Sequence, residues 1–328
     1  MKIFLTGAFG NVGLAVIEEL FAHGHETYIF DLKNKKNKNL AKKIKHSYTK
    51  LIWGDIRDDI ILEKAVTGCE CIIHLAAIVP PESEKSKSNC DEINSGGTNN
   101  IIKAALSTGG NIPLVYVSSA SVMGPTQDKI PPLSTNNAPN PTTYYAKSKM
   151  TAEKSIRNSG LDYCILRLAS VMDSGSDYSE DMLKLLFEFP LSGRNEIILD
   201  TDAAKAIVVS AEKITNDSNL KGKIFFIGGG SKNGCQITNR DMISGMFTAM
   251  GIGMLSEKCF TTDFSEYSMD WYDTTESNNI LDYQDHTLED YIKIVEKKTE
   301  SGGFFVKYMA PRLKSAMEVQ SPYYKNNN

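Results

Sequence analysis

The sequence has 328 residues, 41% of them apolar and 23% charged, with 24 glycines and 11 prolines. This composition is that of a globular protein with a large core, and it excludes collagen-like and largely disordered chains. The formal net charge of −4 argues against general binding to nucleic acid or to an anionic membrane.

Short β-branched or aromatic runs alternate with helix-length periodic segments along the first two thirds of the chain. We predict strands at 2–6, 26–30, 51–54, 71–75, 113–118, 163–168 and 223–227. Helices are predicted at 12–23, 94–107, 145–158 and 202–214. Because this alternation is typical of βαβ units, the predicted fold class is α/β, with a Rossmann-type doubly wound parallel sheet.

The alternation weakens after residue 168, where loop-like and glycine-rich segments precede further helices. We predict a dinucleotide-binding domain of residues 1–170 plus about 196–230, and a smaller, mostly C-terminal substrate-binding region of about 171–195 plus 231–328. The second region is expected to cap the carboxyl ends of the strands, where open α/β sheets bind ligands.

The cysteines and the apolar segments indicate the cellular setting. Six cysteines show neither a CxxC pair nor the spacing of a zinc site, so buried free thiols and no metal are expected. The start MKIFLTG is strand-like rather than a secretory signal, and the most apolar stretch, 72–79, is far shorter than the ~20 residues that cross a bilayer. The sequence predicts a cytoplasmic protein without a membrane span.

The motif TGAFGNVG at 6–13 lies between the first predicted strand and helix. Gly7 can form a sharp turn, Gly10 lets the backbone approach a pyrophosphate, and Gly13 lets the helix pack on its strand. The positive end of the helix would then meet the phosphates. A glycine-rich turn that binds no nucleotide is the alternative.

Asp31 ends the second predicted strand, where a carboxylate can accept hydrogen bonds from the adenosine ribose hydroxyls. This favours NAD over NADP, because the carboxylate would repel a 2′-phosphate, although Lys33, Lys35 and Lys36 can offset part of the repulsion. Eight lysines and no acidic residue lie between Lys33 and Lys50. We interpret them as a solvated loop or helix face rather than a nucleic-acid site.

A possible reaction centre follows from Tyr145 and Lys149, whose spacing places a phenol and an ammonium group on one helix face. The ammonium group favours the phenolate, which can act as a base at neutral pH. The same spacing also occurs in ordinary amphipathic helices. Ser119, at the end of the fifth predicted strand, strengthens the catalytic interpretation, because its hydroxyl can hydrogen-bond a reacting oxygen.

Together these segments resemble the extended short-chain dehydrogenase/reductases, also called the NAD-dependent epimerase/dehydratase family. The resemblance extends over about the first 170 residues and more weakly through 202–204 and 225–229. The matching segments are TGAFGNVG at 6–13, Asp31, GDI at 54–56, HLAA at 74–77, NSGGT at 94–98, SSASVMG at 118–124, Tyr145 with Lys149, and LR at 166–167.

This resemblance implies a role for each matching position. Tyr145 would be the catalytic acid/base, Lys149 would bind the nicotinamide ribose and tune the tyrosine, and Ser119 would orient the substrate. Asp55 would accept from the adenine amino group, and His74 would be structural. The implied cofactor-binding residues are Gly7, Gly10, Asn11, Val12, Gly13, Asp31, Asp55, Ile56, Leu75, Ala76, Ala77, Asn94, Tyr145, Lys149 and Ala169.

Departures from the family pattern narrow the function. Family 4,6-dehydratases carry an Asp-Glu pair after the active-site hydroxyl residue, whereas this chain has Ala120 and Ser121, so dehydration is disfavoured. The segment before Asp202 is shorter than the one with which nucleotide-sugar epimerases clamp a nucleoside diphosphate. Arg194 is a candidate phosphate contact, because a guanidinium can bind phosphate in a bidentate manner, and an exposed surface arginine is the alternative.

Three functions are compatible with these residues. The first is an NAD-dependent epimerase or oxidoreductase acting on a nucleotide sugar, and the second is an NAD(P)-dependent reductase or dehydrogenase of a smaller carbonyl or hydroxyl compound. The third, a non-catalytic dinucleotide sensor or scaffold, is disfavoured by the presence of Tyr145, Lys149 and Ser119. The resemblance also implies a homodimer through the helices at 94–107 and 145–158, with Ile101, Ile102, Met150 and Ile156 as candidate contacts.

Overall fold

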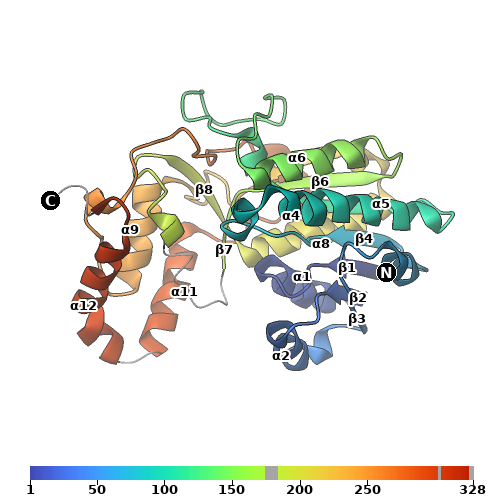
Figure 1. Cartoon of the computed structure of the whole chain (residues 1–328), viewed down its shortest axis with the longest axis horizontal. Helices are drawn as coiled ribbons and strands as arrows, with labels where there is room; N and C mark the ends of the chain where they lie inside the picture. Colours follow the sequence, from blue (N-terminus) through green and yellow to red (C-terminus); the bar gives the residue numbers. More distant parts are fainter. Residues whose placement is uncertain (174–183, 302–303, 325–328) are drawn as a thin grey trace.

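The computed structural model describes residues 1–173, 184–301 and 304–324. A parallel sheet of seven strands lies at its centre, in the order β3-β2-β1-β4-β5-β6-β9 (Figure 1). The strands are β1 Lys2–Thr6, β2 Glu26–Asp31, β3 Lys50–Trp53, β4 Cys71–His74, β5 Leu114–Ser119, β6 Tyr163–Leu168 and β9 Lys223–Ile227. Each boundary lies within one residue of its prediction, which confirms the Rossmann-type α/β class.

Strand alternation explains how the sheet buries both faces. Ile3 and Leu5 belong to one apolar cluster, and Phe4 between them belongs to another. The first cluster is covered by α1 Asn11–Ala22 and α8 Asp200–Asn216. The second cluster is covered by the helices α3 Asp59–Val66, α5 Gly97–Ser107 and α6 Tyr144–Arg157.

The helix predicted at 94–107 has a different start. A short helix, α4 Lys87–Cys90, leads into a π-helical turn, Asp91–Gly96, and only then into α5. Asn94 lies in this turn, where its side chain bonds to residues outside the helix. Such turns often occur where a side chain has a functional position, and hydrophobic periodicity does not reveal them.

The lysine-rich segment forms α2 Lys35–Lys43 and its flanks. All eight lysines between 33 and 50 are exposed, and the buried side of the helix is provided by Asn37 and Ala41. The interpretation of this segment as a solvated face is therefore confirmed.

A second, three-stranded sheet has the order β10-β8-β7 and comprises β7 Ser170–Met172, β8 Arg194–Leu199 and β10 Gln236–Thr238. It packs with α9 Asn239–Ala249 and α11 Leu288–Ser301 around a separate apolar cluster, to which α12 Phe304–Gln320 adds Met317. Between β8 and β10 the chain returns to the main sheet through α8 and β9, and α10 Thr275–Leu281 lies beside β9. In Figure 1 this second unit lies beyond the carboxyl ends of the main strands.

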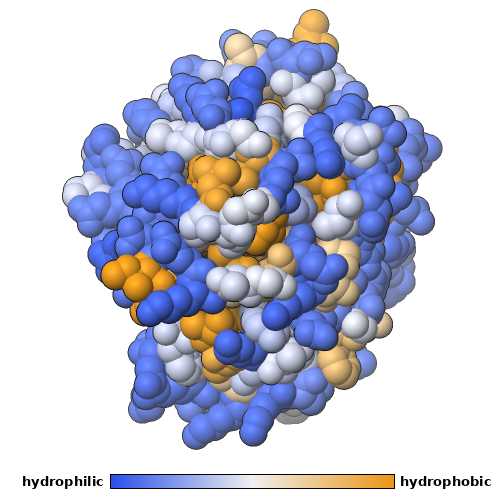
Figure 2. Space-filling model, turned by 90° about the vertical axis from the view of Figure 1, so that its right-hand side faces the viewer, coloured by the Kyte–Doolittle hydropathy of each residue, from blue (hydrophilic) through white to orange (hydrophobic). Residues whose placement is uncertain are grey.

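The thiols are buried, and the face shown in Figure 2 is mostly hydrophilic. All six cysteines are buried and free, as predicted. Hydrophilic residues cover most of the face on the right of Figure 1, and hydrophobic ones show in small areas between them (Figure 2). None of the helices within the described ranges combines the length and the apolar character needed to cross a membrane.

The residues predicted to form a dimer contact lie mostly inside the subunit. Ile101 and Ile156 are fully buried in the cluster beneath α5 and α6, and Ile102 is nearly so. Met150 packs partly buried against a further cluster beside β6. The three isoleucines therefore face the sheet, so a pairing of α5 and α6 with a second copy would use other positions than these.

Candidate active site

A cavity of about 670 Å³ opens at the carboxyl ends of the main strands. It lies where β1 is flanked by β2 and β4, so the strand order reverses there, as at the ligand crevice of open α/β sheets. The sequence-predicted residues that line it are Gly7, Gly10, Asn11, Val12, Gly13, Asp31, Asp55, Ile56, Leu75, Ala76, Ala77, Ser119, Tyr145, Lys149 and Ala169. Asn94 and Arg194 are not among the lining residues.

The glycine turn forms one end of this cavity. Gly7 has φ +70°, and a Cβ there would lie 2.6 Å from the backbone nitrogen of Ala76, so only glycine fits. A Cβ on Gly13 would lie 2.3 Å from the Gly7 carbonyl oxygen, which explains the tight contact between α1 and its strand. At Gly10 the nearest such atom is 3.4 Å away, so the cavity side is open to a ligand.

The N-terminus of α1 is suited to an anion. Gly10 caps the helix without a side-chain hydrogen bond, and the first turn contains no acidic residue. Its backbone N–H groups and the helix dipole are therefore available to a phosphate group. This open cradle and the size of the cavity, within the roughly 300–1,000 Å³ of ligand sites, fit a dinucleotide.

Asp31 is held in place at the end of β2. Its carboxylate accepts hydrogen bonds from the backbone N–H groups of Phe9 at 2.8 Å and Leu32 at 2.7 Å, and from the Asn37 side chain at 3.1 Å. Burial raises the pKa of Asp31, and the two backbone donors act in the opposite direction. Asn37 comes from the lysine-rich helix and was not anticipated, since no motif identifies it.

The adenine end predicted for the cavity carries Asp55 and Arg57. The Arg57 guanidinium donates to both carboxylate oxygens of Asp55, at 2.9 Å and 2.6 Å, and this pairing lowers the pKa of Asp55. Both side chains are partly exposed, so the pair can open to a ligand.

Two polar residues near the cavity support its walls. Asn94 accepts from the Ile78 N–H at 2.9 Å and donates to the Ser148 hydroxyl at 3.0 Å, so it connects the segment after β4 to α6. His74 is fully buried between the hydroxyls of Thr6 and Thr98, and burial lowers its pKa to about 3. A neutral ring in this position has a structural role.

Tyr145, Lys149 and Ser119 converge at the other end of the cavity. The Tyr145 phenol interacts with the Ser119 hydroxyl, and the Lys149 Nζ lies 5.8 Å from the centroid of the Tyr145 ring. Burial raises the pKa of Tyr145, whereas the interaction with Ser119 lowers it. Burial lowers the pKa of Lys149 to about 8, against the effect of Glu153. Lys149 is thus mainly cationic at pH 7, and its Nζ atom donates to the Val117 carbonyl oxygen at 2.8 Å.

Helix α6 is anchored at several points that sequence reasoning did not identify. The Glu84 carboxylate accepts from the backbone N–H groups of Tyr144 and Tyr145, at 2.9 Å and 3.0 Å, and so holds the start of the helix. Two turns further on, buried Glu153 pairs with Arg167 at 2.7 Å. These contacts join segments remote in sequence, and no local spacing signals them.

Arg194 lies at the base of the second sheet rather than in the cavity. Its guanidinium donates to both carboxylate oxygens of Asp270, at 2.7 Å and 3.0 Å, and to the carbonyl oxygens of Thr126 and Lys129. Asp270 is fully buried. The arginine therefore joins two loops, and its Nε and Nη2 atoms donate in that contact.

The fold, the glycine cradle and the Ser119, Tyr145 and Lys149 cluster define an extended short-chain dehydrogenase/reductase. The chain belongs to the 3-beta hydroxysteroid dehydrogenase/isomerase family, whose family model matches residues 4–236.

Individual relatives are more distant. The chain is 24% identical over 251 residues to the 3 beta-hydroxysteroid dehydrogenase/Delta 5→4-isomerase of Mycobacterium tuberculosis, a match covering 69% of this chain and 64% of that enzyme. It is 31% identical over 157 residues to an Escherichia coli O157:H7 enzyme, N-acetyl-alpha-D-glucosaminyl-diphospho-ditrans,octacis-undecaprenol 4-epimerase, covering 48% and 43%. The chain spans only 53% of the length of a relative from Sinorhizobium fredii.

Solved structures share the fold. UDP-glucuronic acid 4-epimerase from Bacillus cereus, in complex with UDP-glucuronic acid and NAD, superposes with a TM-score of 0.75 at 20% identity. The superposition covers 92% of this chain and 100% of that one.

Proposed function

We propose that the protein is an NAD-dependent oxidoreductase that interconverts a secondary alcohol and a ketone, with Tyr145 as the acid/base. The observation that carries this proposal is the position of Tyr145, Lys149 and Ser119 in the same cavity as the glycine cradle. The nicotinamide would take or return the hydride. NAD is preferred to NADP because the Asp31 carboxylate lies on the cavity wall, where a 2′-phosphate would meet it.

Each polar group has a distinct part in the proposed reaction. The Ser119 hydroxyl orients the substrate oxygen, and Tyr145 removes the hydroxyl proton as the C–H bond gives up its hydride. Lys149 stabilises the phenolate through its charge and hydrogen-bonds a ribose hydroxyl. In the direction of reduction, Tyr145 returns the proton to the oxygen of the ketone.

The apolar part of the cavity wall favours an apolar substrate. Val79, Ile93, Val171 and Met269 are among the residues that line the cavity. Among the described lining residues the only cations are Arg57, which is paired with Asp55, and Lys149. A nucleoside diphosphate would need further positive groups, and Arg194 is bound to Asp270. We therefore propose an uncharged secondary alcohol or ketone of small or medium size.

An epimerase of a diphosphate-linked sugar, such as a nucleotide sugar, is the second candidate. The 31% identity with the Escherichia coli epimerase, whose name gives a sugar linked through diphosphate to undecaprenol, favours an epimerase. Both reactions begin with the oxidation of a substrate hydroxyl group, with Tyr145 as the base. A dehydratase reaction is not proposed, because Ala120 is buried and apolar and Ser121 donates its hydroxyl to Ser119 at 2.9 Å. Neither residue provides a carboxylic acid for the loss of water.

The test measures NADH formation from NAD⁺ with a set of cyclic secondary alcohols, a 3β-hydroxysteroid among them. In parallel, UDP-sugars are assayed both for NADH formation and for conversion to their epimers, because an epimerase regenerates NAD⁺ in each cycle. We expect turnover with an apolar alcohol and none with UDP-sugars. Turnover or epimerisation of a UDP-sugar alone would favour the second candidate.

The chain offers a matched pair of variants. Tyr145→Phe is expected to lower kcat by roughly 10²–10⁴ with unchanged NAD⁺ affinity, because it removes the proton-transfer group alone. Tyr144→Phe changes the exposed neighbour and should leave kcat unaltered. Full activity of Tyr145→Phe would overturn the proposed mechanism.

A further inference from the structure

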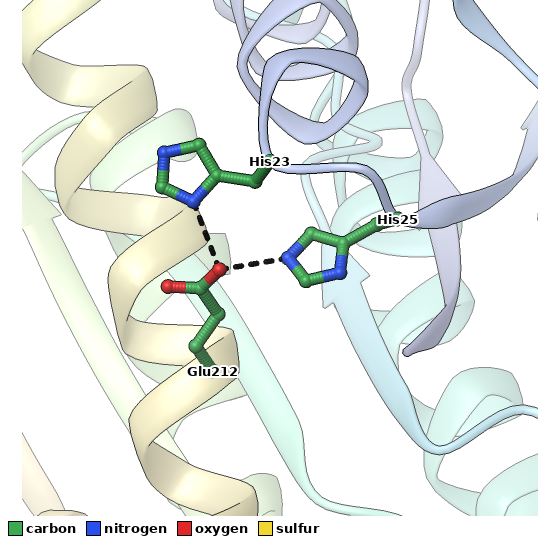
Figure 3. Close-up of side chains that lie close together, drawn as sticks. All are labelled: His23, His25 and Glu212. Atoms are coloured by element: carbon green, nitrogen blue, oxygen red, sulfur yellow. Dashed lines mark hydrogen bonds and ion pairs between the residues drawn. The ribbon is translucent and has the colours of Figure 1, made fainter.

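Two histidines and a glutamate meet at the surface, at the end of the main sheet opposite the cavity (Figure 3). His23 caps the carboxyl end of α1, His25 directly precedes β2, and Glu212 lies on α8. The Nδ1 atom of His23 and the Nε2 atom of His25 lie 2.9 Å and 2.8 Å from the same atom, Oε1 of Glu212. Two imidazole nitrogens from one turn therefore converge on a single carboxylate from another part of the chain.

We propose that His23, His25 and Glu212 bind a divalent transition-metal cation, for which Zn²⁺ is the appropriate probe. Two imidazoles and one carboxylate are a donor set that such cations prefer, whereas Mg²⁺ and Ca²⁺ prefer oxygen ligands alone. The site is separate from the cavity, since it lies at the amino end of β2 and none of its residues lines the cavity.

The geometry needs little adjustment to accept an ion. The three ligand atoms lie within 4.8 Å of one another. Metal bonds of about 2.0–2.2 Å in a tetrahedral arrangement separate ligand atoms by roughly 3.3–3.5 Å. Small side-chain rotations therefore open the space, and the ion replaces the hydrogens that now join the two rings to Glu212. A fourth position stays open to water.

A second carboxylate supports the histidine ligand. The Nε2 atom of His23, which would not bind the ion, lies 3.2 Å from Oε1 of Glu19, one turn earlier on α1. A carboxylate on the distal nitrogen orients the ring and raises its basicity, as around many metal-bound histidines. The His23 and Glu212 side chains are 34% and 30% exposed, so an ion can enter from solvent, while His25 is more buried at 9%.

The proposed ion would connect two segments that pack on the same face of the main sheet. The turn between α1 and β2 supplies both histidines, and α8, which lies against α1, supplies Glu212. The prediction of no metal site was based on local spacing, and Glu212 is 189 residues from His23 along the chain. The six buried cysteines do not offer accessible competing ligands.

The experiment titrates folded, full-length protein with Zn²⁺ by calorimetry, in a buffer with a phosphine reductant because thiol reductants bind zinc. We expect one ion per chain and no binding of Mg²⁺. Glu212→Gln and His25→Ala should each weaken Zn²⁺ binding more than ~10-fold, and Glu19→Gln about tenfold. His46→Ala, which removes an exposed histidine outside the cluster, should leave the affinity unchanged.

The visible absorption of Co²⁺ reports directly on its ligands. If the cluster has only a structural role, Glu212→Gln would not alter this absorption. Wild-type protein with Co²⁺ should show visible absorption bands of a nitrogen- and oxygen-ligated ion, and Glu212→Gln should lose them while its circular dichroism stays native. Equal Zn²⁺ affinity in wild type and Glu212→Gln, or no uptake by folded wild-type protein, would overturn the proposal. A loss of binding in His46→Ala would also contradict it, because the ion would then lie elsewhere.

Discussion

At the glycine-turn end of the cavity, backbone groups and small residues that are close in sequence form the wall. Gly7, Gly10 and Gly13 belong to one turn, and their conformations follow from local geometry. In the unit around the second sheet, outside the cavity, buried charged groups join segments far apart along the chain. Arg194 and Asp270 are 76 residues apart, and Thr126 reaches the same carboxylate across 144 residues.

This difference predicts different responses to mutation. A change in the glycine cradle can block a ligand and leave the fold intact, because the cradle surrounds open space. A mutation that removes one partner of a buried ion pair beside the second sheet leaves the other charge buried alone, so it should act first on stability.

The largest effect is expected for Asp270→Ala. It leaves the Arg194 guanidinium, whose side chain is only 20% exposed, without its carboxylate. We expect the free energy of unfolding to fall by about 3–5 kcal/mol, measured by urea denaturation. Asp285→Ala, which breaks the more exposed pair with Lys205, is the control and should cost less than about 1 kcal/mol. Equal losses of stability in both variants would show that the buried pair beside the second sheet is no more important than an exposed one.

Glu196 makes the stability of the second sheet dependent on pH. Its buried carboxyl group accepts from the backbone N–H groups of Tyr272 and Gly230 and from Gln236, yet burial raises its pKa from 4.5 to about 7. A raised pKa in the folded state means that the stabilisation is fully present below pH 4.5 and is lost as the pH rises through 7.

This group should therefore lower the free energy of unfolding by roughly 3 kcal/mol between pH 4.5 and pH 8. Glu196→Gln should remove that part of the pH dependence in denaturation curves measured across the range. An unchanged slope in the variant would assign the pH dependence to other groups.

Gly10→Ala tests whether the glycine turn binds the cofactor. A Cβ there meets only the Gly7 oxygen, at 3.4 Å, so the fold should be retained with a loss of about 1 kcal/mol or less. The methyl group would nevertheless project toward the pyrophosphate, and we expect NAD⁺ to bind about 10–100-fold more weakly in a fluorescence titration. Unchanged NAD⁺ affinity would place the phosphates elsewhere.

The smallest effect is expected at Asp31. Asp31→Ser removes the carboxylate that would repel a 2′-phosphate and leaves the exposed lysines nearby. The ratio of NADP⁺ to NAD⁺ affinity should rise about tenfold, or about 1.4 kcal/mol, in parallel titrations of both cofactors. An unchanged ratio of the two affinities would show that Asp31 does not contact the adenosine ribose.

The sequence by itself determined the main sheet and the glycine turn at one end of the cavity. Strand alternation and helical periodicity are local signals, and the turn at Gly7 requires a left-handed conformation that glycine adopts readily. The Tyr145 and Lys149 spacing is also local, since one helical turn separates the two residues. These features could be predicted because their physical causes lie within a few neighbouring residues.

Only the tertiary structure decided the rest. The pairing of Arg194 with Asp270 and the meeting of His23 and His25 with Glu212 have no local sign in the sequence. The short strands of the second sheet also lack a periodic signal of sufficient length. A buried charge needs a partner, because burying it alone costs free energy. That partner can come from any part of the chain, because distances in the folded core do not depend on separation along the sequence.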